Sequence, residues 1–127
     1  MVLNRREVKA YLDELKRIVR LGRYRVSPRG KNEQLLIEYA LSEDVIKKII
    51  LGLRVEDFCE AVFNEHPGFE HELLYVFGKT VELQSRFFGT KETVNLYIKF
   101  NKLPNMYVVV ISFHKQDYPL TYRFKKN

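Results

Sequence analysis

The sequence has little of several residue types that would point to particular classes of protein. It contains no tryptophan, one cysteine, four prolines and six glycines in 127 residues. One cysteine excludes a disulfide framework and a multi-cysteine zinc site, and it suits a reducing compartment. No apolar run approaches the roughly 18 residues of a membrane span, and the charged N-terminus is unlike a signal peptide. We therefore expect a soluble, cytoplasmic domain over residues 1–127, without a cofactor.

Charge is abundant and unevenly distributed. The formal net charge is +6, but residues 1–34 carry +6, residues 35–74 carry −6 and residues 75–127 carry +6. If the two basic segments meet in the fold, they form a region that attracts a polyanion such as nucleic acid. The sequence thus leads us to expect that the basic ends converge and that the acidic middle lies away from them.

The first half of the chain has the periodicity of amphipathic helices. Residues 5–21 are predicted to form a helix with a basic polar face. Asn32 is predicted to cap a short second helix, and Ser42 a third one. Residues 55–64 are predicted to add one or two helical turns.

After residue 72 the apolar period changes from 3.6 to 2. Residues 73–77 and 81–88 are predicted to form a hairpin that turns at Gly78 and Lys79. Residues 93–101 alternate regularly between apolar and polar side chains, which predicts a strand with one buried face.

The last apolar segment, residues 106–113, is predicted to be a central strand because it is almost continuously hydrophobic. A turn at residues 103–105 joins it to the preceding strand, and Pro119 limits any later strand to a sheet edge. Helices followed by strands predict an α+β fold in which N-terminal helices pack on a C-terminal antiparallel sheet.

Three polar residues on the last two strands form the strongest candidate site. Tyr97 and Lys99 share one strand face, and His114 ends the most hydrophobic strand. Counting outward from the turn places Tyr97 and Lys99 opposite residues 109–111, with His114 beyond Tyr97's end of the ladder. Tyrosine, lysine and histidine can together move protons and stabilise a phosphorane without a metal. The alternative is a solvated polar face.

The remaining chemically active residues give weaker signals. His66 and His71 lie in an acidic loop around a Pro-Gly turn, but their spacing does not match paired metal ligands on a helix, so no metal site is expected. Cys59 lies in an apolar context and is predicted to be a small core residue.

The strand motifs also carry a family likeness. The runs 96–100, 109–114 and 118–120 resemble the C-terminal half of MqsR-family toxins, which are mRNA interferases with a RelE-like fold. The first half agrees in its basic helix and in the motifs that follow it. The likeness covers most of residues 6–60 and 84–122, and it implies a RelE-like α+β fold.

The chain departs from the family at several motifs. A Phe-Gly-Lys motif often precedes the Tyr-x-Lys strand in the family, and the chain has two candidates for it. Phe77-Gly78-Lys79 keeps the lysine but lies too far from Tyr97, whereas Phe88-Gly89 has about the right spacing but is followed by Thr90. Spacing favours the second, so residues 64–83 are expected to be divergent or inserted. Gln84 keeps the spacing to Tyr97 that a glutamine has in the family. His114 replaces a lysine and could transfer protons near neutral pH.

The resemblance implies metal-independent cleavage of single-stranded mRNA, in which the ribose 2′-OH attacks the phosphate and leaves a 2′,3′-cyclic phosphate. His114 is assigned to proton transfer, Tyr97 to proton transfer or base stacking, and Lys99 to charge stabilisation. The full set of expected catalytic residues is His114, Tyr97, Lys99 and Gln84. The expected RNA-binding residues are Arg23, Arg25, Arg29, Lys31, Arg86 and Tyr118.

The family likeness also implies a partner. A cognate antitoxin is expected to dock either on the acidic segment 35–74 or on an edge strand near Pro119. The main alternative to an enzyme is a basic α+β module that binds RNA or a protein without cutting it.

Overall fold

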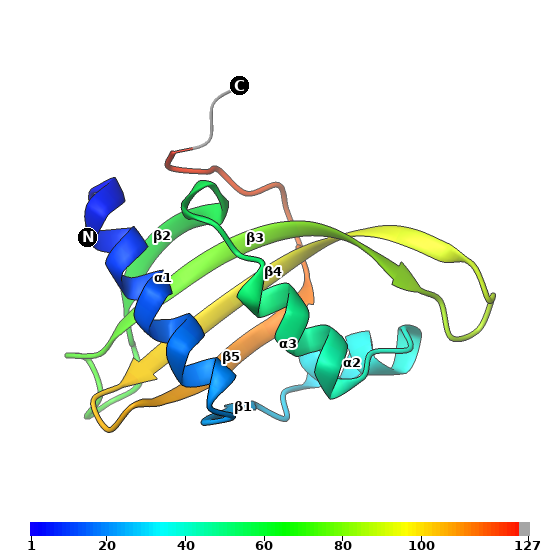
Figure 1. Cartoon of the computed structure of the whole chain (residues 1–127), viewed down its shortest axis with the longest axis horizontal. Helices are drawn as coiled ribbons and strands as arrows, with labels where there is room; N and C mark the ends of the chain where they lie inside the picture. Colours follow the sequence, from blue (N-terminus) through cyan, green and yellow to red (C-terminus); the bar gives the residue numbers. More distant parts are fainter. Residues whose placement is uncertain (125–127) are drawn as a thin grey trace.

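The helices lie in the first half of the chain and the three longest strands in the second (Figure 1). The computed structural model describes residues 1–124. The helical elements are α1 (Arg5–Arg20), α2 (Gly30–Glu38), α3 (Glu43–Leu51) and the single 3₁₀ turn η1 (Val55–Asp57). The strands are β1 (Tyr24–Val26), β2 (Phe58–Phe63), β3 (Leu73–Gln84), β4 (Lys91–Leu103) and β5 (Tyr107–Lys115). The predicted α+β class is confirmed.

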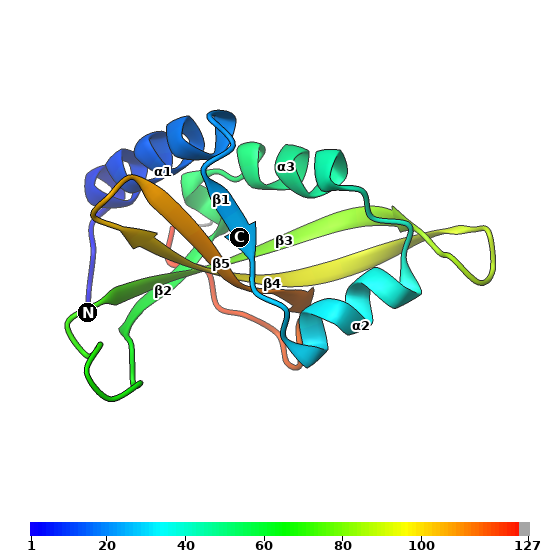
Figure 2. The ribbon, with the colours of Figure 1, turned by 90° about the horizontal axis from the view of Figure 1, so that it is seen from below.

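The five strands form one mixed sheet in the order β1-β5-β4-β3-β2. The expectation of a wholly antiparallel sheet is corrected at one edge, where the short β1 runs parallel to β5. Helices α1 and α3 lie over one face, the helix-covered face, and α2 packs beside β5 (Figure 2). The C-terminal segment 116–124 crosses the other face, here called the open face, where Leu120 and Tyr122 lie over Gly78.

The helix boundaries follow from local capping. Asn4 accepts a hydrogen bond from the backbone N–H of Glu7, whose carboxylate accepts one from the N–H of Asn4. Ser42 caps α3 as predicted, because its hydroxyl accepts from the N–H of Val45. The apolar sides of both helices then face the sheet.

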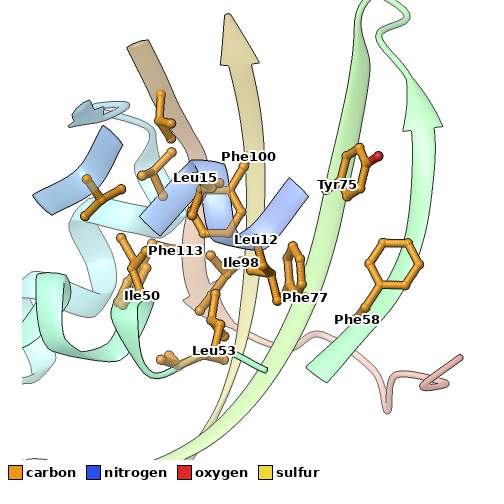
Figure 3. Close-up of a cluster of buried hydrophobic side chains, with 14 of the residues drawn as sticks. Leu12, Leu15, Ile50, Leu53, Phe58, Tyr75, Phe77, Ile98, Phe100 and Phe113 are labelled. Atoms are coloured by element: carbon orange, nitrogen blue, oxygen red, sulfur yellow. The ribbon is translucent and has the colours of Figure 1, made fainter. Parts of the chain in front are cut away.

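The core fills the space between α1, α3 and the helix-covered face (Figure 3). Alternate residues of β4 point into it, so Leu96, Ile98 and Phe100 are fully buried. Several aromatic rings from neighbouring strands meet there edge to face, including Phe77 with Phe100 and Phe58 with Phe77. This packing fixes which face of each strand remains open.

The predicted helix over residues 55–64 is wrong beyond its first turn. Only Val55–Asp57 is helical, and Phe58–Phe63 forms the edge strand β2. A short apolar run fits either period, and pairing with β3 decides the outcome here.

The predicted hairpin turn at Gly78 and Lys79 is also wrong, since β3 runs unbroken through both residues. Gly78 pairs with Tyr97 and permits the close approach of the C-terminal segment. A Cβ at Gly78 would overlap the Tyr122 hydroxyl and lie 2.8 Å from Cδ1 of Leu120. Lys79 forms an ion pair with the mostly buried Asp57, at 3.1 Å.

Candidate functional site

A cleft of 430 Å³ opens on the sheet's open face, beside the start of α2. It joins side chains from β4 and β5 with the loop before α2 and the start of the C-terminal segment. Six of the residues expected in catalysis or RNA binding line it, and they come from five separate segments of the chain, since Tyr97 and Lys99 share β4. The lining residues are Arg29, Gly30, Lys31, Tyr97, Lys99, Ser112, His114, Asp117 and Tyr118.

A β-bulge brings His114 to this cleft. Phe100 pairs with Val110 but Lys99 pairs with Ser112, so Ile111 is an additional residue on β5. One additional residue reverses which side chains face the core. Val110 and Phe113 therefore both point to the core, whereas Ser112 and His114 are on the open face.

The bulge also corrects the predicted register. Tyr97 pairs with His114 and Lys99 with Ser112, rather than with residues 109–111. The turn closes with Leu103 opposite Tyr107, and the bulge shifts every later pair by one residue. His114 thus lies directly opposite Tyr97 and not beyond it.

Asn32 holds the bulge in place. The sequence predicted it as a helix cap, but α2 begins at Gly30, and Asn32 is buried inside its first turn. Its amide nitrogen donates to the carbonyls of Ser27 (2.9 Å) and Ile111 (3.0 Å), and its oxygen accepts from the N–H of Phe113 (2.7 Å). A single side chain therefore ties α2 to both sides of the bulge.

The imidazole of His114 is oriented by two neighbours. Its ring stacks on Tyr97 with 5.2 Å between centroids and 12° between planes. Its Nδ1 lies 2.7 Å from the carbonyl oxygen of Lys115. Because a carbonyl can only accept, Nδ1 carries a hydrogen, and Nε2 of the neutral ring is left as a proton acceptor.

Burial shifts the other two titratable groups at the centre of the cleft. Burial first, and then the nearby Arg29, lower the pKa of the half-buried Lys99 ammonium. Burial and the neighbouring Tyr118 hydroxyl raise the pKa of Tyr97, which keeps its proton at neutral pH. The cleft thus presents a cation of lowered pKa beside a neutral phenol.

The rim of the cleft carries further positive charge from the N-terminal segment. Arg29 and Lys31 are exposed at the start of α2, where no side chain caps the helix. Lys31 forms an ion pair with Asp117, and this holds the pKa of that carboxyl below its usual value. Tyr118 is exposed at the rim, where its ring could stack on a base.

The structure does not bring the other expected residues into the cleft. Gln84 is on the open face but lies six residues along β3 from the Tyr97 partner Gly78, about 20 Å away at strand spacing. The guanidinium of Arg86 donates to three carbonyls at the end of α2, and that of Arg23 donates to Asn105 and Met106. Arg25 is exposed on β1 beside Val109, outside the lining.

The expected separation of charge is only partly found. Arg29 and Lys31 converge with Lys99, but the basic face of α1 lies on the opposite side of the sheet (Figure 2). The acidic middle does not stay away, because Glu60 and Glu65 lie near enough to raise the pKa of Lys99. The expectation that residues 1–34 converge as a whole is therefore wrong.

Several further features lie outside the cleft. Within residues 1–124, no group of three histidine, cysteine or acidic side chains is placed to hold a metal ion, and no helix could span a membrane. No strand follows Lys115 in this part of the chain, so the edge strand near Pro119 does not form. Cys59 lies half-buried on the edge strand β2 and is not part of the core, so its predicted core position is wrong. Burial raises the pKa of its thiol to about 12, which keeps it protonated.

Asn32, Ser112 and Asp117 were absent from the expected site residues. Ser112 and Asp117 line the cleft, and Asn32 sets its geometry. The one available signal is Asn32 itself, because asparagine is unfavourable inside a helix unless its side-chain amide has hydrogen-bond partners. No protein-family model matches this chain, and no curated protein resembles it significantly.

Proposed function

We propose that this chain is an endoribonuclease toxin of the MqsR type, which cleaves single-stranded RNA with its own side chains. The observation that carries the proposal is the convergence of Tyr97, Lys99 and His114 in one cleft with Arg29 and Lys31 at its rim. Cleavage by an internal 2′-OH requires a general base, a cation near the phosphate and groups that bind the neighbouring phosphates.

The proposed chemistry begins at His114. Its Nε2 takes the proton of the ribose 2′-OH, whose oxygen attacks the adjacent phosphorus as the bond to the 5′-oxygen breaks. The neutral Tyr97 hydroxyl donates a proton toward the departing oxygen. The products are a 2′,3′-cyclic phosphate and a free 5′-OH, which conserve every atom of the substrate.

Positive charge in the cleft stabilises the transition state. The ammonium of Lys99 projects from the same strand face as Tyr97, so it can contact the phosphoryl oxygens as they gain charge. The neighbouring phosphates bind to Arg29, to Lys31 and to the N-terminus of α2. The exposed ring of Tyr118 offers a stacking surface for an unpaired base.

The proposal is tested by incubating purified protein with single-stranded RNA in EDTA and analysing the product ends. We expect cleavage that persists with the chelator and leaves cyclic phosphate ends. The combined variant His114→Ala, Tyr97→Phe, Lys99→Ala should lose it, whereas Thr93→Ala, an exposed residue on the same face of β4, should keep it. Cleavage that stops with EDTA, or survives in the triple variant, overturns the assignment.

A binding module that does not cut RNA is the second candidate. The ion pair between Asp117 and Lys31 favours it, because a carboxylate at the rim reduces the charge available for catalysis. Expression in a bacterial host separates the two: an active toxin arrests growth and the triple variant does not, whereas a binding module leaves growth unchanged. The proposal of a toxin also implies a cognate antitoxin that holds it inactive.

A further inference from the structure

A second cleft of the described chain lies away from the proposed RNA site. It is a groove of 630 Å³ between α1 and the segment 53–56, on the helix-covered side of the sheet. We call it the α1 groove. It is lined by five cationic side chains and two carboxylates, with the buried Leu12, Leu53 and Val55 at its floor.

The cations follow one side of α1. Arg6, Lys9, Lys16 and Arg20 recur at spacings of three, seven and four, which puts them on one helix face. Burial first, and then Lys9 and Arg20, lower the pKa of Lys16, so these like charges are close enough to repel one another. An anionic ligand in the groove would relieve that repulsion.

The carboxylates of the chain leave part of this charge uncompensated. Asp13 pairs with Lys9, and Glu56 reaches from η1 to pair with Arg5 across the groove. Among residues 1–124, Arg6, Lys16 and Arg54 form no ion pair. The groove thus accepts carboxylates at two places already and has three further cations available for others.

We propose that the α1 groove binds an acidic segment of a partner protein. Charge complementarity selects the chemistry, and the aliphatic stems of the arginine and lysine side chains provide apolar contact for leucine-like residues between the acids. The lining contains no aromatic or histidine side chain, whereas single-stranded RNA is bound largely by stacking on such rings. A peptide therefore fits this groove better than RNA does.

The location predicts that the two ligands do not compete. The α1 groove and the open-face cleft share no lining residue, and the sheet separates them (Figure 2). A partner held in the groove would leave the cleft of Tyr97, Lys99 and His114 uncovered. This proposal does not depend on whether the cleft cuts RNA.

The test uses the full chain and a synthetic peptide in which glutamate alternates with leucine, compared with its glutamine-leucine counterpart. Binding is followed by NMR shifts and by fluorescence anisotropy. We expect the acidic peptide to shift the amides of residues 5–16 and 53–56 and to leave those of the open face unchanged. The triple variant Arg6→Gln, Lys16→Gln, Arg54→Gln should weaken binding about tenfold, since three surface charge contacts are lost.

A matched variant distinguishes the loss of contacts in the α1 groove from a general loss of positive charge. Arg17→Gln, Lys48→Gln, Lys91→Gln removes the same charge from exposed positions outside the groove, and it should change affinity less than threefold. Equal loss in both variants, shifts centred on the open face, or tighter binding of polyuridylate than of the peptide at the groove would each overturn the proposal. Thermal unfolding of both variants should match that of the original chain.

Discussion

The two faces of the sheet use neighbouring residues of the same strands for different tasks. On β4, Ile98 and Phe100 are completely buried under the helices, while Tyr97 and Lys99 alternate with them and are half-buried on the open face. The first set stabilises the fold through apolar burial and packing. The second keeps polar groups partly dehydrated, which shifts their pKa values without removing them from solvent. Residues that stabilise the fold therefore alternate along the same strand with residues that line the candidate site.

The largest expected effect on stability comes from a substitution on the helix-covered face. Phe100→Ala should lower the free energy of unfolding by about 3–5 kcal/mol, because a buried ring is replaced by a cavity. The adjacent Lys99→Met should leave stability unchanged or raise it, since burial disfavours the charged lysine in the folded state. Urea unfolding of both variants measures the difference, and equal losses would contradict the division between the faces.

The next effect tests how the cleft is held to the core. Asn32→Leu should cost about 2–3 kcal/mol, because it leaves the buried N–H of Phe113 and the carbonyl of Ile111 without their partner. It should also reduce RNA cleavage, since the bulge that presents His114 loses its clamp. Gln34→Leu, on the exposed side of the same helix, is the control and should change neither property appreciably. Unchanged NMR shifts around His114 in Asn32→Leu would show that the bulge does not need this side chain.

The sequence alone predicts those helices and strands whose signal lies in neighbouring residues. The capping sequence at Ser42 and the alternation over residues 93–101 predicted α3 and β4 because neither depends on distant partners. It failed where a tertiary contact decides the outcome. Residues 58–63 become a strand only because β3 lies beside them, and Gly78 continues a strand because the C-terminal segment passes over it.

The same distinction applies to the candidate site. Tyr97 and Lys99 share one face of β4, as the alternation predicted, because strand parity is visible in the sequence. Arg29 and Lys31 line the same cleft from the start of α2, and no local pattern places them there. The pairing of His114 with Tyr97 across β4 and β5 could not be predicted from the alternation of side chains alone. It depends on one additional residue in β5 and on an amide from α2, and neither has a local pattern.

A smaller effect is expected where the C-terminal segment crosses the open face. Gly78→Ala should cost about 1–3 kcal/mol, because its Cβ would overlap Tyr122 and crowd Leu120. Displacing this segment should loosen Tyr118 and weaken RNA binding. Limited proteolysis after residue 115 should therefore become faster. Gly30→Ala, whose Cβ would meet nothing within 4 Å, is the control for stability and digestion and should change neither; identical digestion of the two variants would contradict the proposed packing.

The smallest effect concerns pH and depends on the charges within the open face. Arg29 is one cause of the lowered pKa of Lys99, after burial, and it also opposes the raised pKa of Tyr97. Arg29→Met should therefore raise the pKa of both groups, so each keeps its proton to higher pH. The alkaline limb of RNA cleavage should move upward even though affinity falls. Lys31→Met should weaken binding without moving that limb, because Lys31 pairs with Asp117 and is not among the causes of either shift. A limb that stays fixed or moves downward in Arg29→Met would show that neither Lys99 nor Tyr97 controls the reaction.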